Sequence, residues 1–393
     1  QRPPHEALIA ETTDHLINSG GLTFEGTSKD SRHRYSVFTS AQATNRDSYY
    51  GSEKNAFAYG MTNGVTAVAG GQYLYRVSFF ELTTGVEYNY DYLFDNPIGY
   101  ADEPGYESMI TKQHIHNASI LAQGEFKFRK WGFLLGGRLD NWYNANNKKF
   151  LCIPSPRVTL RYNPTENINL RATYGSGFRA PQAFDEDLHI MAVGGEVAII
   201  SLSPELEPEH SKSISGSLTW TPKIGDNELM LLAEGFYTNL SDVFVLTEKG
   251  FDAQGNLLLE RQNGSGAYVA GVNMEATYSP FIDLNFQLGY TYQQSRYKEP
   301  EQWSDDVEAQ TRMFRTPDHY GYFTIDYTML NSLKFSLSGT YTGSMLVQHF
   351  AGYVEKDEQV ETPQFFDMTL KIAYDIKVSN NSTMQVNAGI KNI

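Results

Sequence analysis

The sequence predicts an all-β protein, an antiparallel transmembrane β-barrel, and three observations lead to that fold class. Apolar and polar residues alternate along the whole chain of 393 residues. Aromatic residues reach 13%, while the hydrophobic fraction is only 40% and the mean hydropathy is −0.43. Short polar connections take turns with long ones. A wall of strands between lipid and a wet lumen requires all three features.

The alternation is clearest in segments that read as single strands. In residues 167–177 (NINLRATYGSG), apolar and polar side chains take opposite faces at every step. Residues 283–292 (DLNFQLGYTY) repeat the pattern, with Phe286 on the apolar face and Gln287 on the polar face. It returns in LKFSLSGTY, FFELTTGVEYNY, ILAQGEFKF, WGFLLGGRL and FFDMTLKIAY. The alternation therefore predicts strands throughout the chain.

A soluble β-sandwich also alternates, so two further features favour the barrel. The apolar faces end in aromatic rings, which suit the headgroup level of a bilayer; these are Tyr174, Trp220, Tyr290, Tyr292, Tyr341 and Tyr374. The polar faces carry charges in mid-strand, namely Glu81, Glu87, Glu125, Arg138, Arg171, Lys334 and Lys371. Unpaired charges are costly in a sandwich core, whereas a wet lumen accommodates them.

The connections differ in length at the two ends of the predicted barrel. Tight turns are expected at 28–32, 162–167, 221–227, 279–283 and 328–332, and long connections at 45–60, 95–111, 143–152, 179–210, 297–313 and 347–361. Outer-membrane barrels have short periplasmic turns and long extracellular loops. The pattern predicts about sixteen strands of roughly ten residues each. There is no run of eighteen apolar residues, so a membrane-spanning helix is excluded.

Charge and cysteine content narrow the functional class. The formal charge of −15 comes from 31 basic and 46 acidic residues without a basic cluster, which disfavours nucleic-acid binding. Cys152 is the only cysteine, so an intramolecular disulfide cannot form. The acidic cluster Asp185, Glu186 and Asp187 is interpreted as solvated loop charge. Since no nucleophile elbow, phosphate-binding loop or HExxH motif occurs, we expect no enzymatic activity.

Two motifs carry a resemblance to a known family, and they flank the long connection after Tyr174. GSGFRAP covers residues 175–181, and LSPELEPEHS covers residues 202–211. They resemble the paired boxes around an extracellular loop of TonB-dependent outer-membrane receptors. The first box is matched by Phe178, Arg179, Ala180 and Pro181, and the second by Pro204, Leu206, Pro208 and Glu209. Ser203 stands where the family usually has Asn, and Glu205 lies within the same box. Both boxes could either shape the loop or contact ligand.

The resemblance implies a barrel of about twenty-two strands closed by an N-terminal plug. Residues 1–393 are then a partial barrel domain, with the plug and the closing strand outside the sequence. It also implies a receptor in the bacterial outer membrane that imports a ferric siderophore, haem or cobalamin with TonB-transduced energy. The implied partners are the TonB complex, acting through the plug, the small-molecule ligand, and outer-membrane lipid with lipopolysaccharide. No covalently bound cofactor is implied.

The histidines give a second set of candidate contacts. His189 lies between the two boxes, where haem receptors of this family place an iron ligand, and Met191 is a nearby soft donor. His349 lies in another expected extracellular loop. His114 and His116 share one strand face, where they could chelate a metal or, more simply, line the lumen as polar residues.

Acidic loops bear on the charge of the ligand. They cover residues 102–107, 299–308 and 355–361, and none has the spacing of a calcium loop. Their charge disfavours a bare anion and leaves neutral or cationic chelates, or carbohydrate.

Two other functions fit a β-rich chain. A passive outer-membrane porin needs no plug and would lack the two boxes. A soluble carbohydrate-binding module predicts blade-like repeats, which the sequence does not show.

Overall fold

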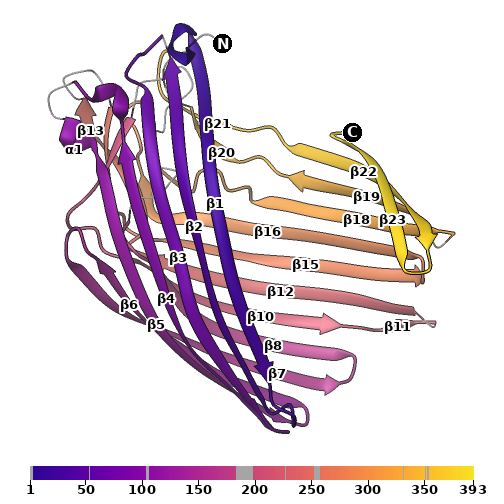
Figure 1. Ribbon diagram of the computed structural model, residues 1–393. Helices are drawn as coiled ribbons and strands as arrows, with labels where there is room; N and C mark the ends of the chain where they lie inside the picture. Colours follow the sequence, from indigo (N-terminus) through magenta and orange to yellow (C-terminus); the bar gives the residue numbers. More distant parts are fainter. Residues whose placement is uncertain are drawn as a thin grey trace.

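The computed structural model describes residues 3–52, 54–102, 106–182, 198–225, 227–251, 257–330, 332–349, 351 and 354–393. Most of the chain forms one antiparallel sheet of eighteen strands, in which β11 (Lys223–Ile224) and β17 (Gln310–Arg312) are short additions. The other sixteen strands form an unbroken ladder in which each pairs with the next one along the chain. Figure 1 shows this ladder curving into a barrel wall. The predicted fold class and number of strands are confirmed within the described residues.

The sixteen strands of the wall have these bounds: β1 (Ile9–Thr27), β2 (His33–Ser52), β3 (Tyr59–Arg76), β4 (Phe80–Asn96), β5 (Thr111–Phe128), β6 (Trp131–Asn144), β7 (Lys149–Thr165), β8 (Ile168–Arg179), β10 (Glu209–Trp220), β12 (Asn227–Ser241), β15 (Ala267–Phe281), β16 (Leu284–Glu301), β18 (His319–Met329), β19 (Leu333–Thr342), β22 (Phe365–Ser379) and β23 (Ser382–Lys391). The connections contain η1 (Pro4–Glu6), η2 (Ile98–Tyr100), α1 (Tyr106–Met109), β9 (Ala198–Leu202), β13 (Phe244–Phe251), β14 (Leu257–Asn263), β20 (Leu346–His349) and β21 (Glu358–Glu361). No helix among the described residues is long and apolar enough to cross a membrane.

The two ends of the wall differ as the sequence predicts. Tight turns such as 28–32 and 282–283 join strands at one end. The longer connections gather at the other end, where α1 and β13 lie at the upper left of Figure 1. We call these the turn end and the loop end.

Two of the expected long connections are shorter than predicted. β2 and β3 extend into the range 45–60, and only residues 145–148 separate β6 from β7. The reason is backbone pairing, which continues beyond the roughly ten residues needed to cross a bilayer and joins Asn144 to Lys149. The Asn146 side chain then accepts a hydrogen bond of 2.7 Å from the backbone N–H of His114.

The outward face of the wall is apolar, as the alternation predicts. On β16, Phe286 and Leu288 are 38% and 58% exposed, and both point away from the lumen. Gln287 points inward and donates a 3.3 Å hydrogen bond to the Tyr322 hydroxyl. The predicted terminal rings Tyr174, Trp220, Tyr290, Tyr292 and Tyr374 are all exposed. They form part of an aromatic belt at the edges of the apolar band.

The lumen carries paired charges, as predicted for the polar faces. Arg138 donates to Glu87 and to Asp140, each at 2.9 Å. Nearer the turn end, Glu81 and Glu125 both lie within salt-bridge distance of Lys127. Charges on alternate residues of adjacent strands meet inside because the register puts them on one face.

Candidate functional site

The two sequence motifs lie side by side at the loop end of the wall. β8 ends at Arg179, and β10 begins at Glu209, directly opposite it in the ladder. Phe178 is paired in the same way with His210. Strand pairing stops here because Pro181, which is buried, has no backbone N–H to continue the ladder. The motifs therefore mark the two bases of one long connection.

A contact among three strands joins these bases, and we call it the clasp: Arg179 of β8, Glu209 of β10 and Phe244 of β13. Arg179 Nη1 lies 3.7 Å from Glu209 Oε2. Glu209 Oε1 accepts a 2.5 Å hydrogen bond from the backbone N–H of Phe244. The Arg179 guanidinium also lies 5.6 Å from the centre of the Phe244 ring. Since Arg179 is 42% exposed, the carboxylate-to-backbone bond is the stronger part of the clasp.

The second motif folds into a compact turn before it reaches β10. Leu206 N–H donates to the Ser203 carbonyl at 3.1 Å, and Ser203 N–H donates to the Arg261 carbonyl of β14 at 3.0 Å. Leu206 is 3% exposed, and Pro208 is buried. Glu205 and Pro204 are exposed on the outer side of this turn. The turn is thus held by a small apolar contact and by strand β14.

Two residues outside the motifs hold this turn from either side, and neither was among the residues predicted from the sequence. Asn263 accepts from the Glu207 N–H at 2.8 Å and donates to the carbonyls of Glu207 and Asp242 at 2.9 and 2.7 Å. Lys149 donates to the Leu206 carbonyl at 2.7 Å and pairs with Glu207 at 3.0 Å. The dipeptide Asn263-Gly264 is a turn signal, but nothing local in the sequence indicates its partner.

The connections around the clasp also form their own small sheet. β13 and β14 are antiparallel, and β9 runs parallel to β14. Parallel pairing joins segments that are distant along the chain. Here it joins the connection between β8 and β10, which contains β9, to the connection between β12 and β15, which contains β14. The loop base is consequently a folded support rather than a free segment.

Tyr297 of β16 lies beyond the belt residue Tyr292, above the membrane-spanning part of the strand. Burial raises the pKa of its phenol, and the negative charges of Glu301 and Glu209 raise it further. Tyr297 therefore remains a neutral hydrogen-bonding group near the clasp.

The remaining candidate residues are not brought into the clasp. His349 is exposed at the end of β20 and pairs with Glu358 in the hairpin with β21. His189 and Met191 lie outside the described residues. Among the residues that the structure describes, no group of three or more His, Cys, Asp or Glu side chains is placed to hold a metal ion.

The interpretation of His114 and His116 as polar lumen residues is wrong. His114 is paired with Tyr92, and His116 with Tyr90. These positions share the outward face with Tyr88, which is 43% exposed. The register decides the face, because a shift by one residue would move both histidines inward.

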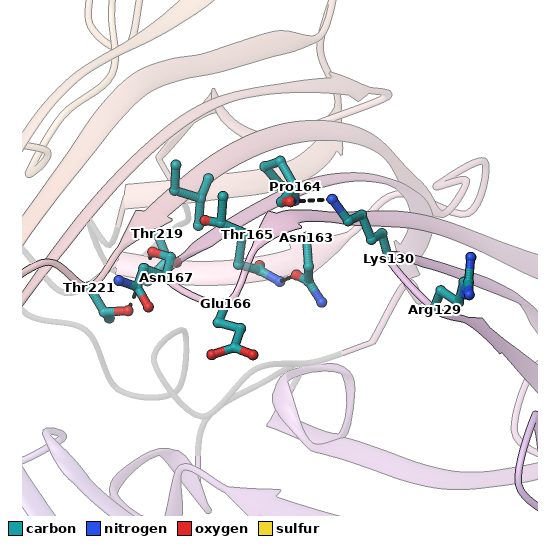
Figure 2. A pocket seen from close by; sticks show the side chains of 11 residues that line it. Arg129, Lys130, Asn163, Pro164, Thr165, Glu166, Asn167, Thr219 and Thr221 are labelled. Carbon is teal, nitrogen blue, oxygen red and sulfur yellow. Dashed lines mark hydrogen bonds between the residues drawn. The ribbon is translucent and has the colours of Figure 1, made fainter.

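A polar pocket of about 700 Å³ lies at the turn end, far along the strands from the clasp. Figure 2 shows its lining, which includes Glu166 in the turn between β7 and β8 and Thr219 near the end of β10. Lys130 Nζ donates to the Pro164 carbonyl at 2.6 Å across it. None of the sequence-predicted candidate residues lines this pocket.

A wall of membrane-length strands with an outward aromatic belt, a charged lumen and supported loops at one end defines an outer-membrane receptor barrel. The chain belongs to the TonB-dependent receptor family, since the model described as "TonB dependent receptor-like, beta-barrel" matches residues 10–393. Members of this family lie in the bacterial outer membrane, which confirms the predicted location.

Solved structures show the same fold at low sequence identity. The ferric-catecholate import receptor Fiu from K12 E. coli has a TM-score of 0.69 at 14% identity, covering 98% of this chain and 60% of its own. The FrpB iron transporter from Neisseria meningitidis (F5-1 variant) has a TM-score of 0.71 at 13% identity, and the alignment covers 97% of this chain and 59% of the FrpB chain. The copper transporter OprC has a TM-score of 0.67 at 16% identity, and the alignment covers 99% of this chain and 61% of the OprC chain.

The chain therefore spans about three fifths of the length of these proteins: the aligned part is 60% of the Fiu chain, 59% of the FrpB chain and 61% of the OprC chain. A search of curated protein sequences found no significant match.

Proposed function

We propose that this barrel belongs to a receptor that binds a scarce metal chelate outside the cell and imports it into the periplasm with TonB-transduced energy. The clasp of Arg179, Glu209 and Phe244 carries the proposal. It fixes the base of the long outer connection at the rim of a lumen lined with charged groups. Binding loops need such a rigid base if they are to present a defined surface to a ligand.

The similar structures point to a cargo that contains a metal. Their names describe ferric-catecholate import for Fiu, iron transport for FrpB and copper transport for OprC. We propose a ferric siderophore as the cargo of this receptor, with haem and cobalamin as variants. His189, Met191 and His349 are the candidate contacts for haem iron, and the TonB complex would act through a plug domain.

The charge of the loop end refines the proposed cargo. Glu205 and Glu207 are exposed beside the clasp, and Lys149 pairs with Glu207 at 3.0 Å. Asp305 and Glu308, in the connection after β16, are exposed as well. Negative charge at an entrance repels anions over several ångströms. We therefore propose a neutral or cationic ferric chelate, of the trihydroxamate kind, rather than a highly anionic tricatecholate.

A passive porin is the second function that fits a β-barrel. The family match and the supported loop end favour a receptor over a porin, and over a soluble carbohydrate-binding module. We propose that the protein performs no covalent chemistry, since binding and passage require only non-covalent contacts.

Binding by the purified full-length protein tests the cargo. Intrinsic tryptophan fluorescence would be followed during titration with a neutral ferric trihydroxamate, an anionic ferric tricatecholate, haem and cobalamin. We expect the trihydroxamate to bind at least tenfold more tightly than the tricatecholate. Tighter tricatecholate binding would overturn the charge argument. Preferential haem binding that is lost in His189→Ala would replace the siderophore by haem.

A further inference from the structure

The polar pocket at the turn end has no role in the import function proposed above. Its volume of about 700 Å³ is typical of sites for small molecules and short peptides. Asn169 of β8 is paired with Thr219 of β10, and both alternate with the outward residues Leu170 and Trp220. The pocket therefore opens on the lumen side of the wall, at the mouth that the short turns surround.

Hydrogen bonds between neighbouring turns hold the lining of the pocket in place. The Asn163 N–H donates to the Lys130 carbonyl at 2.7 Å, and Lys130 Nζ donates to the Pro164 carbonyl at 2.6 Å. On the other side, the Thr221 N–H donates to the Asn167 carbonyl at 2.8 Å. These bonds join the turn after β5, the turn after β7 and the end of β10, so the pocket is preformed.

Two side chains of opposite charge in the pocket lack partners among the described residues. Arg129 and Glu166 are exposed, and neither forms a hydrogen bond or an ion pair with another residue that the structure describes. They come from two different turns, and Figure 2 shows both in the lining. The two-residue turn between β5 and β6 holds Arg129 at a φ of +44°, which non-glycine residues adopt rarely. The pocket therefore presents a guanidinium and a carboxylate that are available to a ligand.

The composition of the lining selects the class of ligand. Among the described residues that line the pocket none is aromatic, so a sugar ring or a nucleobase has no ring to stack on. A guanidinium binds a carboxylate through paired N–H groups, and a carboxylate binds an ammonium group. The amide and hydroxyl side chains can bond to peptide groups; they are Asn163, Thr165, Asn167, Asn169, Thr219 and Thr221. A short peptide with a free carboxylate and a free amine satisfies all of these groups.

We propose that this pocket binds the stem peptide of the bacterial cell wall, a short peptide with free carboxylates and the free amine of a diamino acid. Short turns of outer-membrane barrels face the periplasm, where this peptide projects from the cell-wall polymer. Arg129 and Lys130 bind a carboxylate of the peptide, and Glu166 binds its amine. This inference rests on the membrane orientation of the wall and is independent of the cargo proposed above.

A single peptide should bind weakly, because Arg129 and Glu166 are exposed and ion pairs in water contribute little free energy. The cell wall compensates for this weakness because it carries many copies of the peptide on one network. Many receptors in one membrane can then bind many peptides at once, which raises the overall affinity. The pocket thus attaches the barrel to the cell wall without a large interface.

The test uses the full-length protein purified in detergent and the synthetic peptide L-Ala–γ-D-Glu–diaminopimelate–D-Ala. Calorimetry would measure binding to the wild type, Arg129→Asn and Glu166→Gln. Arg129→Asn removes the cation but keeps a residue that accepts a left-handed φ, and Glu166→Gln removes only the charge. We expect each variant to bind the peptide about fivefold more weakly than the wild type. Arg32→Gln, in the turn 28–32 at the same end and outside the pocket, should bind like the wild type.

Modified peptides would show which charge meets which residue. Amidation of the carboxylates should weaken binding to the wild type by about fivefold and have little further effect on Arg129→Asn. Acetylation of the diaminopimelate amine should act in the same way with Glu166→Gln. Isolated cell walls should sediment with the wild-type protein but release Arg129→Asn/Glu166→Gln.

Heat-modifiable migration in gels would establish that each variant is folded. Equal binding of the peptide by the wild type and a folded Arg129→Asn variant would overturn the proposal, and so would equal binding of the free and amidated peptides. An all-L peptide with a lysine and a free C-terminus that binds as tightly would assign the pocket to protein termini instead of the cell wall.

Discussion

Arg179 and Glu209 are opposite each other in the first paired position of the β8–β10 ladder, with Nη1 and Oε2 3.7 Å apart. Glu209 also accepts the backbone N–H of Phe244 at 2.5 Å. One carboxylate thus connects two motifs that are far apart in the sequence and a third strand from the next connection. The loop base depends on Glu209 more than on any exposed charge of the same motif.

Replacing Glu209 with Ala should loosen the loop base without unfolding the wall. The change leaves the Phe244 N–H without this acceptor, and a hydrogen bond to a charged group contributes about 1.5–3 kcal/mol. Limited proteolysis of the folded protein should cut residues 198–210 roughly tenfold faster. Glu205→Ala, at an exposed position of the same motif, is the matched control. Equal cleavage rates for both variants would show that the clasp does not restrain the loop.

Leu206 tests the apolar part of the same support. Its side chain is 3% exposed within the turn that Lys149 and Asn263 hold. Leu206→Ala should destabilise the loop base by about 2–4 kcal/mol, whereas Leu206→Met should cost less than about 1.5 kcal/mol. Hydrogen exchange at residues 203–209 would report the difference. Unchanged protection in Leu206→Ala would indicate that hydrogen bonds alone hold the turn.

Which side chains of β16 point toward lipid can be tested by introducing an arginine at either of two adjacent positions. Phe286 faces lipid, and Gln287 faces the lumen. Phe286→Arg should reduce the folded fraction in lipid vesicles, because an arginine facing lipid costs up to about 2–4 kcal/mol near the bilayer midplane. Gln287→Arg should fold like the wild type. Equal tolerance of the two substitutions would contradict the register.

The lumen pairing of Arg138 makes a prediction about stability. The Asp140 side chain is 4% exposed, and Arg138 is its cationic partner at 2.9 Å. Arg138→Met should lower the unfolding free energy by about 2–3 kcal/mol, since a buried carboxylate loses its counterion. Adding Asp140→Asn should recover most of that loss. Urea unfolding in vesicles would measure both variants; a loss that persists in the double variant would mean that Arg138 acts through packing.

Local periodicity was sufficient to predict the wall. The faces of Phe286 and Gln287, and the inward charges Glu87 and Arg138, follow directly from a period of two. The two motifs also predicted where β8 ends and β10 begins. These features depend only on residues that are close together in the sequence.

Long-range contacts and strand register could not be predicted from local sequence patterns. The support of Leu206 by Lys149 and Asn263 joins three connections, and no local pattern encodes it. His114 and His116 were assigned to the wrong face because polar residues suggested the lumen, although the register pairs them with outward tyrosines. Aromatic neighbours on the adjacent strand were the signal that could have placed them correctly.

Uptake of a radioactive ferric trihydroxamate by cells that carry the full-length receptor tests whether the protein is an active, TonB-dependent importer. We expect saturable uptake that is abolished when TonB is deleted or the inner-membrane potential is collapsed, while binding to the cells persists. Uptake that proceeds equally without TonB and rises linearly with concentration would contradict it and identify a passive pore.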